Sequence, residues 1–176
     1  VALGKVLSPQ FLIWLVPAVP LVGGIRGLRA SVLLAGALVL TSPRQRATRT
    51  AELAGLEING ITEDLAEWDY GDYEGITTEE IRETVPGWTV WSHPCPHGET
   101  ADDVARRADS VLADARAADT DVVLVGHGHF SRVLVSRWLD RPATDGVHFA
   151  MDAAGWAVLG DERGVPRIDG LNYRPL

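Results

Sequence analysis

Short apolar runs alternate along most of this chain with longer amphipathic stretches. The runs at 36–40 and 121–126 are continuous, rich in Val and Leu, and followed by polar residues, as is typical of parallel strands buried on both faces. Further short strands are predicted at 61–67, 148–151 and 156–159. Helical patterns cover 45–54, 77–84, 100–118 and 130–139. Strands separated by helices of this length predict an α/β fold, a three-layer α/β/α sandwich around a mostly parallel sheet.

The N-terminal region has a different pattern. Residues 6–25 carry no charge, which superficially suggests a signal peptide or a membrane span. Three prolines, Pro9, Pro17 and Pro20, interrupt the helix that a span requires, and the unbroken apolar run at 11–16 has the length of a buried strand. We therefore expect a strand here and no association with a membrane.

The distribution of acidic residues also sets the N-terminal region apart from the rest of the chain. Residues 1–36 contain no Asp or Glu, whereas residues 37–176 contain all 24. We therefore predict an atypical N-terminal segment over 1–36 and a domain over 37–176. The whole chain has 176 residues and 46% hydrophobic residues, enough for one folded core, which excludes disordered and fibrous classes.

Charge and cysteine content exclude further classes of protein. The formal net charge is −8 and the basic residues are scattered, so no nucleic-acid partner is expected. The single cysteine, Cys95, excludes an internal disulfide framework and a four-cysteine metal site, and it suits a reducing cytoplasm. Chemistry must therefore come from His, Asp, Glu, Arg and Ser.

Arginines follow the strand predicted at 36–40. In α/β folds the functional crevice lies at the carboxyl ends of the parallel strands. Arg44, Arg46 and Arg49 occupy this position at the start of a helix, whose free amides and dipole favour an anion. Arg44 and Arg49 are more simply explained as solvated surface charges. Arg46 is the candidate for binding phosphate.

A second polar group follows the strand predicted at 121–126. His127 comes directly after this strand, and Gly128 would allow a backbone amide to approach an oxyanion closely. By itself His127 could equally be a hydrogen-bonded core residue. The arginines at the matching position after another strand favour a functional role.

A metal site is an alternative interpretation of the histidines. His127 and His129 would need a third ligand, which the loop His93-Pro-Cys95-Pro-His97 could supply. Ligand spacing of this kind is common by chance, and the prolines indicate a surface loop. We therefore expect no metal, and a metal-dependent hydrolase is the less favoured class.

A carboxylate-rich and aromatic-rich segment supplies the third element. Glu67 is close in sequence to Trp68 and Tyr70, so partial desolvation would favour a protonated carboxyl that can deliver its proton to a leaving group. The neighbouring Asp69, Asp72 and Glu74 are better explained as solvated loop charges.

Four motifs in register carry a family resemblance. They are Ser42-x-x-x-Arg46-Ala47-x-x-Thr50-Ala51, Leu65-x-Glu67-x-x-x-Gly71-x-x-Glu74-Gly75, Gly98-Glu99-Thr100 and Val123-Leu-Val-Gly126-His127-Gly128. Over about 37–176 the chain resembles the histidine phosphatase superfamily, which has the phosphoglycerate-mutase-like fold. It looks most similar to small bacterial acid phosphatases that carry Gly-His-Gly-His-Phe-Ser-Arg, here residues 126–132.

The resemblance implies a phosphomonoester hydrolase that needs no cofactor. Arg46 would clamp phosphate together with His127 and the Gly128 amide, Glu67 would be the proton donor or acceptor, and His127 would be the second active-site histidine. The substrate would be a small phosphorylated metabolite, with inorganic phosphate as product. The short spacing between Glu67 and His127 favours a phosphatase over a mutase, because the mutases resemble a longer version with an inserted segment.

The chain departs from the family at one point. The family begins with a strand running into Arg-His-Gly, whose histidine is the nucleophile, and this tripeptide is absent from the sequence. Residues 1–36 look like a replacement of that strand, the nucleophile loop and the first helix. Two hypotheses follow: a hydrolase that is inactive as encoded, or a non-enzymatic remnant that binds phosphate or a protein.

Overall fold

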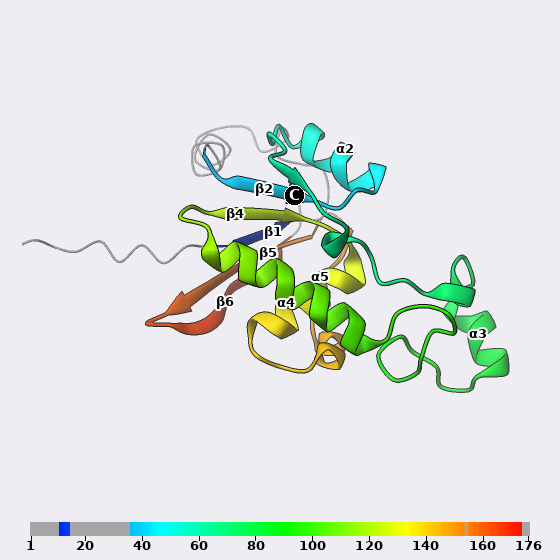
Figure 1. Cartoon of the computed structure of the whole chain (residues 1–176). Helices are drawn as coiled ribbons and strands as arrows, with labels where there is room; N and C mark the ends of the chain where they lie inside the picture. Colours follow the sequence, from blue (N-terminus) through cyan, green and yellow to red (C-terminus); the bar gives the residue numbers. More distant parts are fainter. Residues whose placement is uncertain (1–10, 15–35, 154, 174–176) are drawn as a thin grey trace, which may run out of the picture.

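The computed structural model describes residues 11–14, 36–153 and 155–173. These residues form one sheet covered by helices (Figure 1). The strands are β1 (Phe11–Trp14), β2 (Leu38–Thr41), β3 (Gly60–Ile61), β4 (Val122–Val125), β5 (Trp156–Glu162) and β6 (Val165–Tyr173). The α-helices are α2 (Gln45–Leu53), α3 (Thr78–Thr84), α4 (Ala101–Ala117) and α5 (Gly128–Trp138). The 3₁₀ turns are η2 (Glu63–Leu65), η3 (Gly71–Tyr73) and η4 (Ala143–His148).

The six strands follow the order β3-β2-β4-β1-β5-β6. Strands β3, β2, β4 and β1 are parallel to one another, and the hairpin β5–β6 continues the sheet in antiparallel fashion from β1. The predicted α/β sandwich with a mostly parallel sheet is therefore confirmed. Among the described residues, no helix is both long and apolar enough to span a bilayer.

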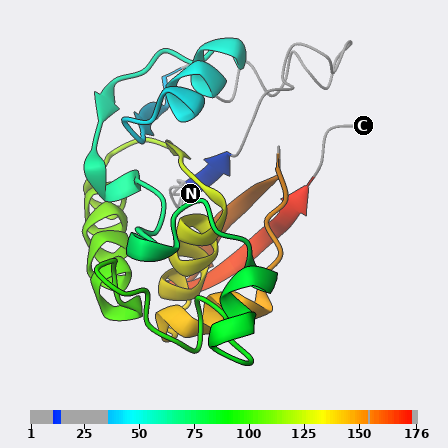
Figure 2. The same ribbon diagram turned by 90° about the vertical axis from the view of Figure 1, so that its right-hand side faces the viewer.

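The alternation of side chains on β4 builds two core layers. Val123 and Val125 pack in a cluster with Ala47 and Ala51 of α2. Val122 and Leu124 point to the other face and join the larger cluster that contains the buried residues of α4 and α5. Viewed from the side, α2 and the α4–α5 pair cover opposite faces of the sheet (Figure 2).

The apolar run at 11–16 contributes the central strand. β1 pairs in parallel with β4 and in antiparallel with β5, so it joins the two halves of the sheet. Trp14 and Thr41 are both in register with Val125. The carboxyl ends of β1, β2 and β4 therefore meet at one edge, where the functional crevice was predicted.

The predicted helices are confirmed to within two residues at each end. The pairing of Thr100 with Asp103 also forms the expected capping box at the start of α4. In it the Thr100 side chain accepts from the Asp103 N–H, and the Asp103 carboxylate accepts from the Thr100 N–H.

The strand predicted over 61–67 is wrong beyond its first residue. β3 ends at Ile61, and a 3₁₀ turn follows. The Thr62 hydroxyl accepts a hydrogen bond from the Asp64 N–H and caps this turn, which competes with an extended conformation.

The strand predicted over 148–151 is also wrong. The 3₁₀ turn η4 ends at His148, and residues 149–151 form no strand. The Arg132 guanidinium donates to the carbonyls of Gly146 and Val147 and holds this turn in place. The sheet is instead completed by β6, which pairs with β5 through a two-residue turn at Arg163 and Gly164, both with positive φ.

Candidate active site

Arg46 reaches the crevice from the first turn of α2. Its Nε donates a hydrogen bond of 3.0 Å to Nδ1 of His127. Its two Nη groups make no hydrogen bond within the described part of the chain. Arg46 thus presents an open guanidinium edge beside the histidine that follows β4.

His127 is held between two side chains. It is 3% exposed, and its Nε2 lies 2.8 Å from Oγ of Ser42, the residue after β2. Because a guanidinium can only donate, Nδ1 of His127 accepts from Arg46, so the ring proton is on Nε2 and is donated to Ser42. Burial, together with the charges of Arg46 and Arg44, lowers the pKa of His127 to about 4, although the charge of Glu67 opposes this shift. His127 is therefore neutral at pH 7.

Glu67 lies against the start of α5. Its Oε1 accepts hydrogen bonds from the N–H groups of Trp68 (3.0 Å) and Phe130 (2.8 Å), and its Oε2 accepts from the N–H of His129 (3.2 Å). Two of the N–H groups at the start of α5 that lack helical partners are thus satisfied by a carboxylate from a distant segment. The N–H of Gly128, in the same turn, has no partner among the described residues.

A cavity of about 370 Å³ brings the predicted residues together. It is lined by Arg46, Ala47, Thr50, Glu67, Gly126, His127, Gly128, Met151, Asp152 and Ala153. Residues separated by some 80 positions, such as Arg46 and His127, therefore share one pocket. The pocket combines an arginine, a neutral imidazole, a carboxylate and an unpaired backbone N–H.

Sequence reasoning missed a second polar pair near Glu67. The hydroxyl of Tyr70 lies 2.6 Å from Nδ1 of His129. Burial and the nearby carboxylates of Glu67 and Glu74 raise the pKa of Tyr70, so its hydroxyl stays protonated and donates to His129. Burial lowers the pKa of His129, which keeps that ring neutral. In the sequence, Tyr70 could have been noted as an aromatic residue three positions after Glu67.

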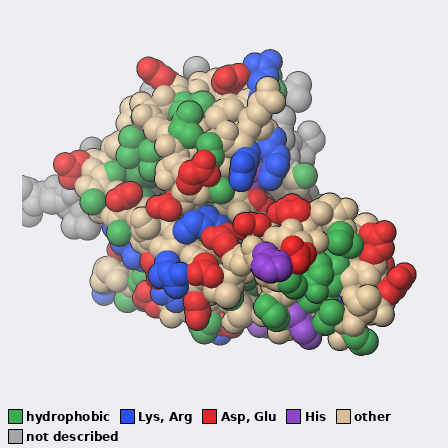
Figure 3. Space-filling model, turned by 45° about the vertical axis from the view of Figure 1, so that its right-hand side comes forward, with side chains coloured by type: hydrophobic (Ala, Val, Ile, Leu, Met, Phe, Trp, Pro, Cys, Tyr) green, Lys and Arg blue, Asp and Glu red, His purple; other side chains and the backbone are tan. Residues whose placement is uncertain are grey.

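The remaining candidate residues lie outside this pocket, and all of them except the buried Cys95 reach the surface. Arg49 is 63% exposed and pairs with Glu52, in agreement with the surface interpretation, and Arg44 is exposed as well. His97 bonds to Asp72, and His93 to Ser92. No three His, Cys, Asp or Glu side chains within the described ranges are grouped so that they could hold a metal ion. Basic and acidic side chains are intermixed on the face shown in Figure 3.

Comparison with known proteins identifies the family. A model of the histidine phosphatase superfamily, branch 1, matches residues 30–174. The chain belongs to the histidine phosphatase superfamily. An acid phosphatase of Mycobacterium tuberculosis is 49% identical to this histidine phosphatase over 142 residues, which cover 78% of this chain and 70% of that protein. The sedoheptulose 1,7-bisphosphatase of Saccharomyces cerevisiae is 29% identical over 126 residues, or 57% of this chain and 46% of that protein.

Solved structures agree with this assignment. The product of a Mycobacterium tuberculosis open reading frame superimposes with a TM-score of 0.79 at 39% identity, covering 94% of this chain and 98% of that one. A mycobacterial glucosyl-3-phosphoglycerate phosphatase in complex with inorganic phosphate gives a TM-score of 0.73 at 22% identity, covering 95% of this chain and 98% of that one. At 22% identity, the similarity to the glucosyl-3-phosphoglycerate phosphatase shows only that the two proteins have the same fold.

Proposed function

We propose that this histidine phosphatase binds phosphomonoesters and inorganic phosphate in the pocket between α2 and α5. The observation that carries the proposal is the contact between Arg46 and His127, because it holds an open guanidinium edge in the same pocket as the unpaired N–H of Gly128. Two Nη donors can bind two phosphate oxygens at once, and the start of a helix adds a favourable dipole. The acid phosphatase relative and the phosphate complex of a structural neighbour support the same ligand class.

In a form of the protein that has the family's nucleophilic histidine, the chemistry that the family implies is phosphoryl transfer in two steps. A histidine nitrogen attacks phosphorus as the ester P–O bond breaks, and Glu67, which must be protonated for this step, donates its proton to the leaving alkoxide. Water then attacks the phosphorus of the phosphohistidine and gives a proton to the Glu67 carboxylate, and the P–N bond breaks to release phosphate and the free histidine. Arg46, His127 and the Gly128 N–H would hold the equatorial oxygens.

The nucleophile is the point on which turnover depends. In the family it follows the first strand, whereas the sequence after β1 continues Leu15-Val16-Pro17, and the first histidine of the chain is His93. His127 does not replace it, because it is expected beside the phosphorus and in-line attack requires a group opposite the leaving oxygen. We therefore propose phosphate binding without appreciable hydrolysis by the chain as encoded.

A chimera tests both parts of this proposal. Its first 36 residues are replaced by a family strand, an Arg-His-Gly loop and a helix. We expect both proteins to bind phosphate and only the chimera to hydrolyse nitrophenyl phosphate, with a difference on the order of 10⁶ when a nucleophile is lost. Comparable hydrolysis by both proteins at equal folded concentration would reveal another nucleophile. Absence of phosphate binding in both would overturn the proposed function.

We further infer a cytoplasmic location. The support is the single cysteine, Cys95, which is free and buried, as suits a reducing compartment. Cell fractionation with a tagged full-length chain tests this inference, and recovery from a membrane or secreted fraction would contradict it.

A further inference from the structure

The segment that carries Glu67 has little regular structure of its own. It runs from the 3₁₀ turn η2, which ends at Leu65, to the turn η3, which begins at Gly71. No strand ladder or helix fixes residues 66–70. Contacts from elsewhere must therefore set the position of the Glu67 side chain.

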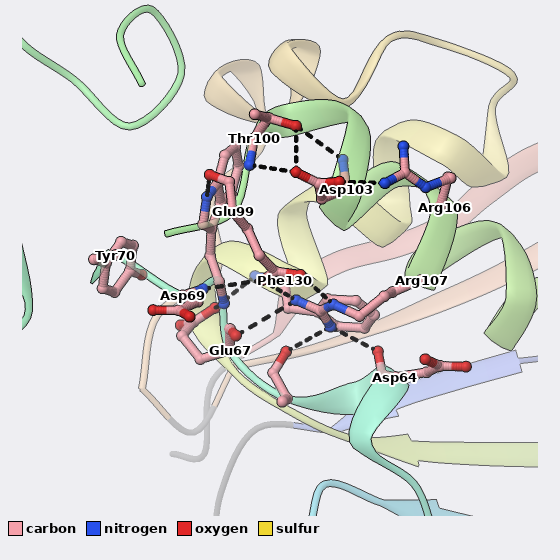
Figure 4. Close-up of polar contacts among 12 residues, drawn as sticks. Asp64, Glu67, Asp69, Tyr70, Glu99, Thr100, Asp103, Arg106, Arg107 and Phe130 are labelled. Atoms are coloured by element: carbon pink, nitrogen blue, oxygen red, sulfur yellow. Dashed lines mark hydrogen bonds and ion pairs between the residues drawn. The ribbon is translucent and has the colours of Figure 1, made fainter. Parts of the chain in front are cut away.

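Arg107 of α4 makes the largest set of these contacts (Figure 4). Its side chain is only 17% exposed, and each of its five N–H groups has an acceptor. Nη1 donates to the carbonyls of Asp64 (2.9 Å) and Ala66 (3.1 Å), and Nη2 donates to the carbonyl of Glu67 (3.4 Å). The remaining two N–H groups bind the Glu99 carboxylate in a two-point contact of 2.7 and 2.6 Å.

Glu99 extends the same clamp to the residues after Glu67. Its Oε2 accepts from the N–H of Asp69 (3.0 Å), and its own N–H donates to the Asp69 carbonyl (2.9 Å). Its carbonyl accepts from Nε1 of Trp68 (2.9 Å). The pair Arg107–Glu99 therefore holds the chain on both sides of Glu67.

Phe130 joins this clamp to the pocket. Its ring stacks under the Arg107 guanidinium, 5.0 Å from the ring centroid, and its N–H donates to Glu67 Oε1. Glu67 is thus fixed at its backbone by Arg107 and at its carboxylate by α5. We propose that Arg107 and Glu99 are positioning residues for Glu67, and that they hold its carboxyl at the rim of the phosphate pocket.

The neighbouring arginine provides a matched control. Arg106 lies next to Arg107 on α4, but its side chain is 71% exposed and pairs with Asp103 at the helix surface. If replacing any arginine on α4 had the same general effect, the Arg106 and Arg107 variants would both show it. A specific effect on Glu67 is expected only in the Arg107 variant.

Amide hydrogen exchange in the full-length chain, followed by NMR, tests the proposal. The N–H of Phe130 precedes the first helical hydrogen bond of α5 and bonds to Glu67, whereas the N–H of Ser131, the next residue, bonds to the carbonyl of His127. Lysine keeps the charge of Arg107 but not its planar fork. In Arg107→Lys we expect Phe130 protection to fall on the order of tenfold relative to Ser131, the scale of a hydrogen bond to a charged group.

Two further variants decide the result if Arg107→Lys folds poorly. Glu99→Gln keeps the side-chain shape, removes the charge and should lower the same protection ratio, whereas Arg106→Lys should leave it unchanged. A wild-type ratio in folded Arg107→Lys or Glu99→Gln overturns the proposal. Equal loss of protection at Phe130 and Ser131 overturns it as well, because it would show that α5 is loosened as a whole.

The proposal rests on the proposed function only for the role of Glu67 as acid. The exchange measurement needs no turnover, so it reports on the placement of Glu67 even if the chain does not hydrolyse esters. In an active form, Arg107→Lys should slow alkyl phosphates more than nitrophenyl phosphate and affect kcat more than KM. A changed exchange ratio without this selectivity would remove the role of Glu67 as acid and leave its positioning intact.

Discussion

Removing the guanidinium of Arg46 should weaken phosphate binding without unfolding the protein. The residue lies at the solvent-exposed start of α2, and among the described residues the one hydrogen bond of its side chain is that to His127. Arg46→Ala therefore leaves no buried charge behind. It does remove two Nη donors from the pocket.

The expected loss can be estimated from these contacts. A hydrogen bond to a charged group contributes about 1.5–3 kcal/mol. Binding also requires Arg46 to give up its bond to the neutral His127, and its exposure lets water screen the anion. We therefore expect about 2 kcal/mol, or roughly a 30-fold higher Kd for inorganic phosphate.

Isothermal titration with phosphate, and with vanadate as a second anion, measures this change. Arg49→Ala is the matched control, because Arg49 lies on the same helix, is 63% exposed and pairs with Glu52. We expect it to change the Kd by less than about twofold. An unchanged Kd in folded Arg46→Ala would refute the assignment, and equal weakening by both variants would show a general charge effect.

Three further predictions concern other residues. In the chimera with a restored nucleophile, Glu67→Gln should slow alkyl phosphates much more than nitrophenyl phosphate, because a good leaving group needs little protonation; equal losses would show that Glu67 is not the acid. The pKa of His127 is about 4 in the native protein, against an ordinary value of 6.5. Between pH 4 and 6.5 the unfolded chain therefore binds more protons than the folded protein. The free energy of unfolding should decrease by up to about 3 kcal/mol as the pH falls from 6.5 to 4. Urea unfolding of wild type and His127→Asn checks this, and identical pH profiles would contradict it. Gly71→Ala should lower the free energy of unfolding by about 3 kcal/mol or more, since a Cβ there overlaps the Pro96 carbonyl. Gly75 also has positive φ but faces open space, so Gly75→Ala should lower it by about 1 kcal/mol. Similar melting temperatures of the two variants would contradict this difference.

The sequence predicted the parts of the fold that depend on local pattern. β2 and β4 were visible as apolar runs, and the polar residues after them, Arg46 and His127, meet because parallel strands end at one edge. The hairpin to β6 was missed, although Arg163-Gly164 is a turn signal between two strand-length segments. The weak apolar content of β6 concealed it.

The clamp around Glu67 was not predicted, because its partners are distant in sequence. A signal was nevertheless present at Arg107, which lies on the same face of α4 as the buried Val104 and Val111, whereas Arg106 lies off that face. A charged residue on an apolar helix face needs a partner. Identifying Glu99 as that partner requires the packing of α4 against the 64–69 segment, which no local pattern contains.

The central place of β1 has a consequence for the order in which the protein folds. Phe11 and Trp14 pair with Val122 and Val125 on one side, and with Leu159 and Trp156 on the other. These pairs join residues that are more than 100 positions apart, so the sheet has a high contact order and a large loop-closure cost. During synthesis β1 leaves the ribosome before either of its neighbours, β4 and β5, and cannot pair with both until β5 has emerged. Closure of the sheet is therefore a late and slow folding step, and an aggregation-prone strand waits unpaired until it occurs.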